Sequence, residues 1–273
     1  MPERLPIEVL VGIEPAVIDP GPSSSASPIA FVEPDDAGTA VVGGGSFNAA
    51  TELGGSGRYT DTVRPGEFVF YRVPLDWGQG LAYRVHFDAN GTRGVENVSN
   101  ITTTLYAPTR EEIVGDFTSY TGTDNVLPSN EPALATAPIR YDNRNSDELD
   151  IRKEALTGWY YIAVKVGSTR EGGENRPVPI RLDLTVSGNT EQVPSYSAPM
   201  ADGIFGENSV ANASSGDGRA KVDGNDGEAT ASDTTAEDPA TTIGVSPIGI
   251  AVAAGVVVLV AVASGFAVRA RRK

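Results

Sequence analysis

The sequence predicts an all-β fold, an antiparallel β-sandwich of jelly-roll type, followed by a linker and one membrane-spanning helix. Three observations lead to the sandwich. Strand-length runs rich in β-branched and aromatic residues recur between residues 45 and 190. Several of these runs alternate apolar and polar residues, as strands do when one face meets a core and the other meets water. Turn signals rich in Gly, Pro and Asn separate them, and no useful helical periodicity interrupts them.

Five of the runs are expected to be strands. In the second of them, every other residue from Leu81 to Phe87 is apolar, and Arg84 and His86 fall on the opposite face. About 145 residues are enough for one sandwich with its own core. The five expected strands are residues 68–74, 81–87, 101–108, 159–166 and 178–186.

Two further segments flank the expected domain. Residues 1–44 contain a strand-like run at 7–13 and a loop, which we interpret as consistent with the end of a missing upstream domain. Residues 191–242 hold ten acidic and two basic residues and almost no large apolar residue. Such a composition cannot bury enough apolar surface to offset the entropy of ordering, so this segment is predicted to be an acidic, disordered stalk.

The strongest single signal lies at the C-terminus. No residue from 239 to 268 is charged, and residues 246–268 are apolar enough to form a transmembrane helix. A basic tail, residues 269–273, follows at once, which is the stop-transfer and positive-inside pattern. We therefore expect a single-pass protein of the cell membrane with its N-terminal region outside and its tail in the cytoplasm. The stop-transfer residues are Arg269, Arg271, Arg272 and Lys273.

The N-terminus does not match this topology. It begins MPERLPIEVLVGI, which lacks the basic region and the long apolar run of a signal peptide. The expected explanation is a chain that is the C-terminal part of a longer protein, or a misassigned start. A tail-anchored protein that faces the cytoplasm is the competing interpretation, but its basic cluster would lie on the disfavoured side of the membrane.

Composition excludes several function classes. The chain has no cysteine, which excludes disulfide scaffolds, thiolate zinc sites and a cysteine nucleophile. Its one histidine, His86, excludes sites that need two, and lies in an expected strand where a surface role is favoured over a general base. The net charge of −15 argues against nucleic acid as a partner. With no G-x-S-x-G motif and no phosphate-binding glycine pattern, we expect neither an enzyme nor a cofactor.

Weaker candidates for ligand contacts remain. Trp77, in an expected turn, is the only named candidate for stacking on a sugar, although core packing explains it as well. Residues 159–161 are three successive aromatics, so at least one must face the opposite side of its sheet. Two polar loops carry oxygen ligands that suit calcium, although solvated charge is the favoured explanation. The calcium candidates are Asp88, Asn90, Asp142, Asp147 and Asp150.

Several of these runs resemble a known family. The segments PGEFVFYRVPLDWGQGLAYRVHF, TTTLYAP and GWYYIAVKV resemble bacterial pre-peptidase C-terminal domains. The run GGGSFNAATEL, with FYRVPLDWGQ, GWYYIAV, the acidic stalk and the basic tail, is similar to the juxtamembrane region of actinobacterial surface proteins with a von Willebrand factor A domain. The resemblance covers about residues 40–273 and implies a fold and a location but no active site.

The functional expectation is a non-enzymatic, membrane-anchored module that presents a β-sandwich, and an upstream domain, at the bacterial cell surface. The expected partners are the lipid bilayer and a protein or cell-wall component outside the cell. A carbohydrate- or cell-wall-binding domain is the first alternative, and an accessory domain of a secreted hydrolase is the second.

Overall fold

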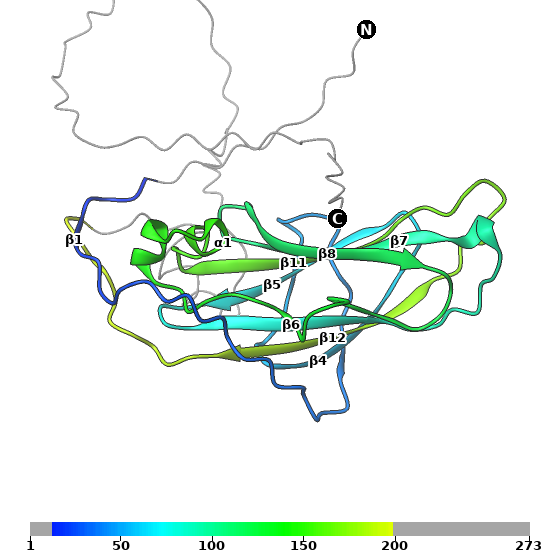
Figure 1. Ribbon diagram of the computed structural model, residues 1–273, viewed down its shortest axis with the longest axis horizontal. Helices are drawn as coiled ribbons and strands as arrows, with labels where there is room; N and C mark the ends of the chain where they lie inside the picture. The colour runs from blue at the N-terminus through cyan, green and yellow to red at the C-terminus, as the bar shows by residue number, and fades with distance from the viewer. Residues whose placement is uncertain (1–12, 199–273) are drawn as a thin grey trace, which may run out of the picture.

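Strands with one apolar face must pack in two layers to bury those faces. The computed structural model describes residues 13–198, and in it a six-stranded sheet packs on a five-stranded sheet (Figure 1). The predicted all-β sandwich is thereby confirmed. The expected transmembrane helix lies outside the described residues.

The six-stranded sheet, sheet I, has the order β10-β6-β12-β4-β2, and β9 also pairs with β6. Its long central strand β12 pairs antiparallel with both β6 and β4. The strands are β2 (Thr39–Ala40), β4 (Gly57–Val63), β6 (Gly80–Phe87), β9 (Asn125–Leu127), β10 (Leu134–Ala135) and β12 (Val178–Ser187).

The five-stranded sheet, sheet II, has the order β3-β5-β11-β7-β8. Its long strands are antiparallel, whereas the two-residue strands β3 and β2 run parallel to their neighbours β5 and β4. The predicted antiparallel pairing therefore holds for the long strands. The strands are β3 (Thr51–Glu52), β5 (Phe68–Leu75), β7 (Ser99–Tyr106), β8 (Glu112–Tyr120) and β11 (Gly158–Val166).

A third, two-stranded sheet pairs β1 (Val17–Asp19) with β13 (Ser195–Tyr196) beside the sandwich. The helical segments are short and lie in connections between strands. They are the 3₁₀ helices η1 (Val95–Asn97) and η2 (Tyr141–Asn145) and the helix α1 (Leu149–Arg152).

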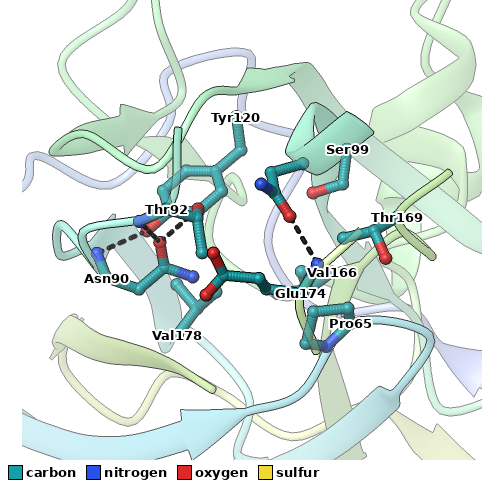
Figure 2. A pocket seen from close by; sticks show the side chains of 10 residues that line it. Pro65, Asn90, Thr92, Ser99, Tyr120, Val166, Thr169, Glu174 and Val178 are labelled. Atoms are coloured by element: carbon teal, nitrogen blue, oxygen red, sulfur yellow. Dashed lines mark hydrogen bonds between the residues drawn. The ribbon is translucent and has the colours of Figure 1, made fainter. Parts of the chain in front are cut away.

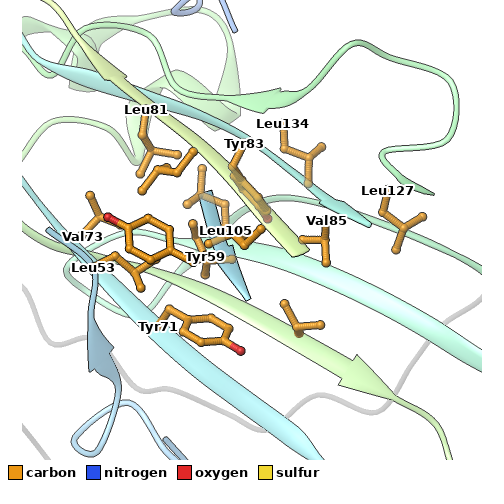
Figure 3. Close-up of a cluster of buried hydrophobic side chains, with 14 of the residues drawn as sticks. Leu53, Tyr59, Tyr71, Val73, Leu81, Tyr83, Val85, Leu105, Leu127 and Leu134 are labelled. Carbon is orange, nitrogen blue, oxygen red and sulfur yellow. The ribbon is translucent and has the colours of Figure 1, made fainter. Parts of the chain in front are cut away.

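One apolar core fills the space between sheets I and II (Figure 3). Two hydroxyl groups cross this core: the Tyr83 hydroxyl lies 3.0 Å from the Thr103 hydroxyl, and the Tyr71 hydroxyl donates to Oδ2 of Asp61 at 2.7 Å. Burial raises the pKa of both tyrosines, so each remains a neutral hydrogen-bonding group. These bonds satisfy polar atoms that the aromatic core would otherwise leave unpaired.

All five strands expected from the sequence are present, as β5, β6, β7, β11 and β12. The strands β4 and β8 were not expected. Their sequences, GRYTDTV and EIVGDFTSY, contain charged residues and glycine, which are depleted in strands, and pairing with neighbours overrides this local preference. The expected strand at residues 7–13 lies outside the described part of the chain except for residue 13.

The folded unit extends beyond the expected start at residue 45. Residues 29–38, which we call the N-terminal strap, run over sheet I before β2 joins its edge. The backbone N–H of Val32 donates to the Thr185 hydroxyl at 3.0 Å, and that hydroxyl donates to the Val32 carbonyl at 2.8 Å. Such long-range contacts have no sequence signature, so only the structure reveals this boundary.

Candidate binding face

Alternation along β5 and β11 sends one set of side chains into the core and the other to the outer face of sheet II. The three successive aromatics divide accordingly. Tyr160 lies in the main core, whereas Trp159 and Tyr161 belong to a second buried cluster with Phe70 on the other side of the sheet. The sequence-based expectation that these aromatics occupy both sides of the sheet is therefore confirmed.

A loop between β2 and β3 covers this second cluster with one phenylalanine. The Phe47 ring centroid lies 4.7 Å from that of Phe70, and 5.2 and 5.1 Å from those of Tyr106 and Tyr161. The two tyrosine contacts are edge-on, a favoured arrangement for aromatic rings. Phe47 is thus the outermost ring of an aromatic stack that closes half of the outer face.

Contacts at both ends of this loop hold it in place: backbone hydrogen bonds at Gly44, and the Arg110 side chain over the Phe47 ring. Gly44 exchanges two backbone hydrogen bonds with Phe70, of 3.0 and 2.8 Å, and a Cβ on Gly44 would lie 1.7 Å from the carbonyl oxygen of Ala49. On the other side, Arg110 has a φ of +63°, a conformation that costs energy in a non-glycine residue. Its guanidinium lies 5.3 Å from the Phe47 ring.

The other half of the outer face remains open to solvent. Strand register places Phe68, Lys165, Thr102 and Phe117 side by side across four strands, and we call them the aromatic row. Phe68 is 39% exposed and Phe117, on the edge strand β8, is 68% exposed. Three strand spacings separate the two rings, about 14 Å. Phe68 and Phe117 are the aromatic residues among the exposed large hydrophobic side chains of residues 13–198.

Three of the four residues in the neighbouring row are small. Ala163 and Thr104 are register partners, and Thr104 faces Gly115 on β8. The fourth member of that row is Phe70, the register partner of Ala163, and its ring centroid lies 4.6 Å from that of Phe68. The combination of two apolar rings, a hydroxyl and an ammonium group can dock a partner with apolar faces and polar edges, either a protein or a sugar.

The sugar-stacking candidate from the sequence, Trp77, lies elsewhere. It is 2% exposed and belongs to the main core. The turn after β5 carries the indole inward, where it packs under the end of the sandwich, so its face is not available to a ligand. Trp159 is also covered, by the Arg72 guanidinium at 4.2 Å from the ring centroid.

On sheet I, the outer face carries a charged cluster around a buried carboxylate. Asp183 is fully buried, although alternation along β12 predicts a solvent-facing side chain there. Arg58, Arg181 and His86 surround it, and the N-terminal strap contacts the Arg58 side chain. Arg58 Nε donates to Asp183 Oδ1 at 2.9 Å, and Arg181 Nε lies 3.2 Å from Oδ2. The bond to Asp183 raises the pKa of the Arg58 guanidinium.

The single histidine joins this cluster. His86 Nε2 lies 3.1 Å from Asp183 Oδ2, and the Arg181 guanidinium lies 3.0 to 3.1 Å from both ring nitrogens. Burial lowers the pKa of His86, and the nearby positive charge of Arg181 lowers it further. His86 is thus a half-buried imidazole within the charged cluster around Asp183 rather than the surface residue that the sequence favoured.

A small polar pocket closes one end of the sandwich (Figure 2). It includes Asn90, whose Oδ1 accepts from the backbone N–H and the hydroxyl of Thr92 at 3.1 and 2.7 Å. Tyr120 donates to the carbonyl of Asp88 at 2.5 Å. The two bonds from Thr92 occupy the amide oxygen of Asn90 within the loop itself, as in an ordinary Asx turn.

The other calcium candidates lie around η2 and α1. Asp142 accepts from the backbone N–H of Ser24 at 3.1 Å and from the Asn145 side chain at 2.7 Å, and these bonds lower its pKa. Asp150 pairs with Lys153 at 3.0 Å, and Asp147 is exposed between the two. Between residues 13 and 198, no group of three or more His, Cys, Asp or Glu side chains is arranged to hold a metal ion.

One buried acid escaped the sequence analysis. Glu154 is 2% exposed, and its Oε2 accepts the backbone N–H of Ala137 at 2.8 Å. Burial raises its pKa to about 8. No pattern in the sequence marks this glutamate, because it follows a short helix in a polar stretch that resembles any solvated loop.

The residues expected to form the membrane anchor and its basic tail lie outside the described part of the chain. Arg269, Arg271, Arg272 and Lys273 lie outside the described residues, as do the stalk beyond residue 198 and the expected span. Within the part of the chain that the structure describes, no helix is long and apolar enough to cross a bilayer.

Comparison with known proteins yields only remote likenesses. No family model and no curated protein matches the chain. Among solved structures, a periplasmic inhibitor of g-type lysozyme from Aeromonas hydrophila matches 54% of this chain and all of its own, at 11% identity and a TM-score of 0.26. A CBM4 structure matches 49% of this chain and 72% of its own, at 14% identity and a TM-score of 0.26. Similarities this weak carry no functional argument.

Proposed function

We propose that this chain is a non-catalytic, single-pass module of a bacterial cell surface that holds a binding sandwich outside the membrane. The aromatic row carries the proposal for binding, because exposed Phe68 and Phe117 flank Lys165 and Thr102 on an otherwise well-packed face. The uncharged run at 246–268 and the basic residues after it support the anchor. The acidic segment 191–242 would hold the sandwich away from the bilayer.

Membrane topology is testable because the chain has no native cysteine. Single cysteines at Val95, which is 71% exposed, and at Lys273 would be treated on intact cells with a membrane-impermeant maleimide. We expect Val95→Cys to be labelled at once and Lys273→Cys only after permeabilisation. Labelling of Lys273→Cys on intact cells, with protection of Val95→Cys, would establish the opposite orientation and remove the proposal.

Partner binding is testable by photo-crosslinking in native membranes. A photoreactive phenylalanine would replace Phe117, and a matched control would replace Leu149, which is equally exposed at 68%. We expect one defined adduct from position 117 that weakens when Phe68 is changed to Ala, and none from position 149. Equal adducts at both positions would show that the aromatic row is ordinary surface.

A second candidate function is cell-wall carbohydrate binding. It is favoured by the same row, because a planar ring beside hydroxyl and ammonium groups can stack on one face of a sugar and hydrogen-bond its edge. The full chain in detergent would be sedimented with purified wall sacculi. Retention that falls in Phe117→Ala and Phe68→Ala but not in Leu149→Ala supports a glycan; equal retention of all variants rejects it.

A further inference from the structure

The two ends of the described chain are paired with each other. Val17 on β1 faces Tyr196 on β13, and the backbone N–H of Ser197 donates to the Ala16 carbonyl at 2.8 Å. The pairing is antiparallel. The chain before β1 and the chain after β13 therefore leave the sandwich from the same end and in the same direction. We call β1, β13 and the 3₁₀ helix η2 beneath them the terminal clasp.

Two arginines at η2 fasten the clasp. Arg144 forms a two-pronged ion pair with Glu14, at 2.8 and 3.0 Å, and Tyr196 donates to the same carboxylate at 3.2 Å. Glu14 thus ties β1 to β13 and to η2 at once. The Arg144 guanidinium also lies 3.5 Å from the centroid of the Tyr141 ring.

The second arginine, Arg140, forms a similar set of contacts with residues that lie closer to the sandwich along the chain. Arg140, just before η2, forms a two-pronged ion pair with Glu191 at 2.6 and 2.5 Å and donates to the Ser23 carbonyl at 2.9 Å. It therefore joins the segment after β1 to the segment before β13. Paired, two-pronged geometry is the arrangement in which Arg–carboxylate contacts are strongest.

The clasp is nevertheless weaker than the sandwich behind it. Its sheet has two register pairs, whereas β12 forms seven with β4 and eight with β6. Its strands contribute little to the core, and Ile18 is 72% exposed. Segments with few buried apolar contacts open at a lower free energy than the core of the same protein.

The direction of the pairing decides what tension would do. Because both ends leave from the same end of the clasp, a pull that separates them breaks its contacts one after another. The long strands of the sandwich carry no load while the clasp is closed. We propose that the terminal clasp is a tension latch, which opens before the sandwich and lengthens the tether while the binding face stays folded. The proposed membrane anchor enters only as the source of the pull.

Opening of the latch would release a defined length of extended chain. The next backbone contact inward on the N-terminal side is Ile29 to Thr136, and on the C-terminal side the Glu191 N–H donates to the Trp77 carbonyl at 3.2 Å. Roughly 25 residues lie outside these points, which corresponds to about 80 Å of extended chain. Unfolding of the sandwich itself would release roughly 550 Å.

Single-molecule stretching of the full chain in detergent tests this proposal. Azide-bearing residues at positions 13 and 198, both exposed, would serve as handles. We expect a reversible step of about 80 Å at low force, followed by a much longer step at higher force. A single long event without the short step would overturn the latch.

Three variants assign the short step to the clasp. Arg144→Ala and Arg140→Ala should each lower the force of the short step and leave the long step unchanged. Lys153→Ala is the matched control, because its ion pair with Asp150 lies in α1 and touches neither β1 nor β13. A short step that responds equally to all three variants would not come from the clasp.

A disulfide lock provides the opposite test. Asp19 and Ser195 are register partners, so Asp19→Cys with Ser195→Cys can form a cross-strand disulfide in this cysteine-free chain. The oxidised variant should lose the short step and regain it on reduction. A short step that persists in the oxidised variant would overturn the proposal. These outcomes do not depend on membrane topology, so failure of the latch and failure of the proposed function are distinguishable.

Discussion

Arg58 and Asp183 lie on adjacent strands of sheet I and join a buried charge to the N-terminal strap. Through Nε, Arg58 donates to the carboxylate of Asp183 at 2.9 Å. Through its two terminal nitrogens it donates to the backbone carbonyls of Pro34 at 2.7 Å and Asp36 at 3.1 Å. Arg58 therefore links the buried carboxylate of Asp183 to the backbone of the strap.

This relationship predicts a large cost for neutralising the buried acid. In Asp183→Asn, the shape is kept but the positive charges of Arg58 and Arg181 lose their counter-charge in a covered site. We expect a loss of about 3 kcal/mol in the free energy of unfolding, measured by denaturant titration of the full chain. Asp150→Asn is the control, because its exposed pair with Lys153 should contribute less than about 0.5 kcal/mol. Equal small losses in both variants would contradict this account.

The buried Glu154 predicts an unusual pH dependence. Its pKa is raised by burial to about 8 in the folded protein, against an ordinary value of 4.5. The folded state thus favours the protonated form. The contribution of Glu154 to stability is greatest below pH 4.5 and is lost as the pH rises towards 8. Glu154→Gln keeps an acceptor for the Ala137 N–H and cannot ionise.

We expect the stability of Glu154→Gln relative to the wild type to increase between pH 4.5 and 8, on the order of a few kcal/mol in total. Unfolding titrations of both proteins at matched pH values measure this difference. Glu171→Gln, on an exposed carboxylate in the loop between β11 and β12, is the control. A constant difference for Glu154→Gln across this range would mean that the carboxyl group is ionised in the folded state.

Trp77 is expected to act in folding and not in ligand contact. Trp77→Ala removes a core indole and should cost about 3–5 kcal/mol, measured as a shift in the unfolding midpoint. Trp77→Phe should cost clearly less, because it keeps an aromatic ring and removes a ring N–H that is buried without a hydrogen-bond partner within residues 13–198. A stable, fully folded Trp77→Ala protein that fails to bind wall sacculi would restore Trp77 as a ligand residue.

Two adjacent glycines offer a sharp comparison in the loop that carries Phe47. In Gly44→Ala, the new methyl group would collide with the Ala49 backbone, so the loop must leave the aromatic stack. In Gly45→Ala, nothing lies within 4 Å of the new methyl group. We expect a loss of about 2 kcal/mol for the first and less than about 0.5 kcal/mol for the second. Similar unfolding midpoints would show that this loop contributes little to stability.

The five longest apolar runs predicted five strands correctly because each has both β-forming residues and an uninterrupted pattern. The strands β4 and β8 failed that criterion, since Asp61 and Gly115 weaken the local preference. Pairing on a sheet edge or beside a long neighbour stabilises such sequences, and pairing is a long-range property. The sequence predicted only part of the candidate face. Residues 159–161 indicated aromatics on both sides of a sheet, but no local pattern placed Phe117 and Phe68 at the two ends of one row.

The sequence by itself determined the all-β class and the strands of the core, because alternation of polarity is written into neighbouring residues. It also determined that this chain holds no cysteine nucleophile, no thiolate metal site and no site that needs two histidines, since it has no cysteine and one histidine. Only the tertiary structure decided that Trp77 is buried and Phe117 exposed, and that Asp183 is buried beside Arg58, 125 positions away. It also decided that the two chain ends meet in a clasp. These outcomes depend on which distant segments pack together, and no local pattern encodes that choice.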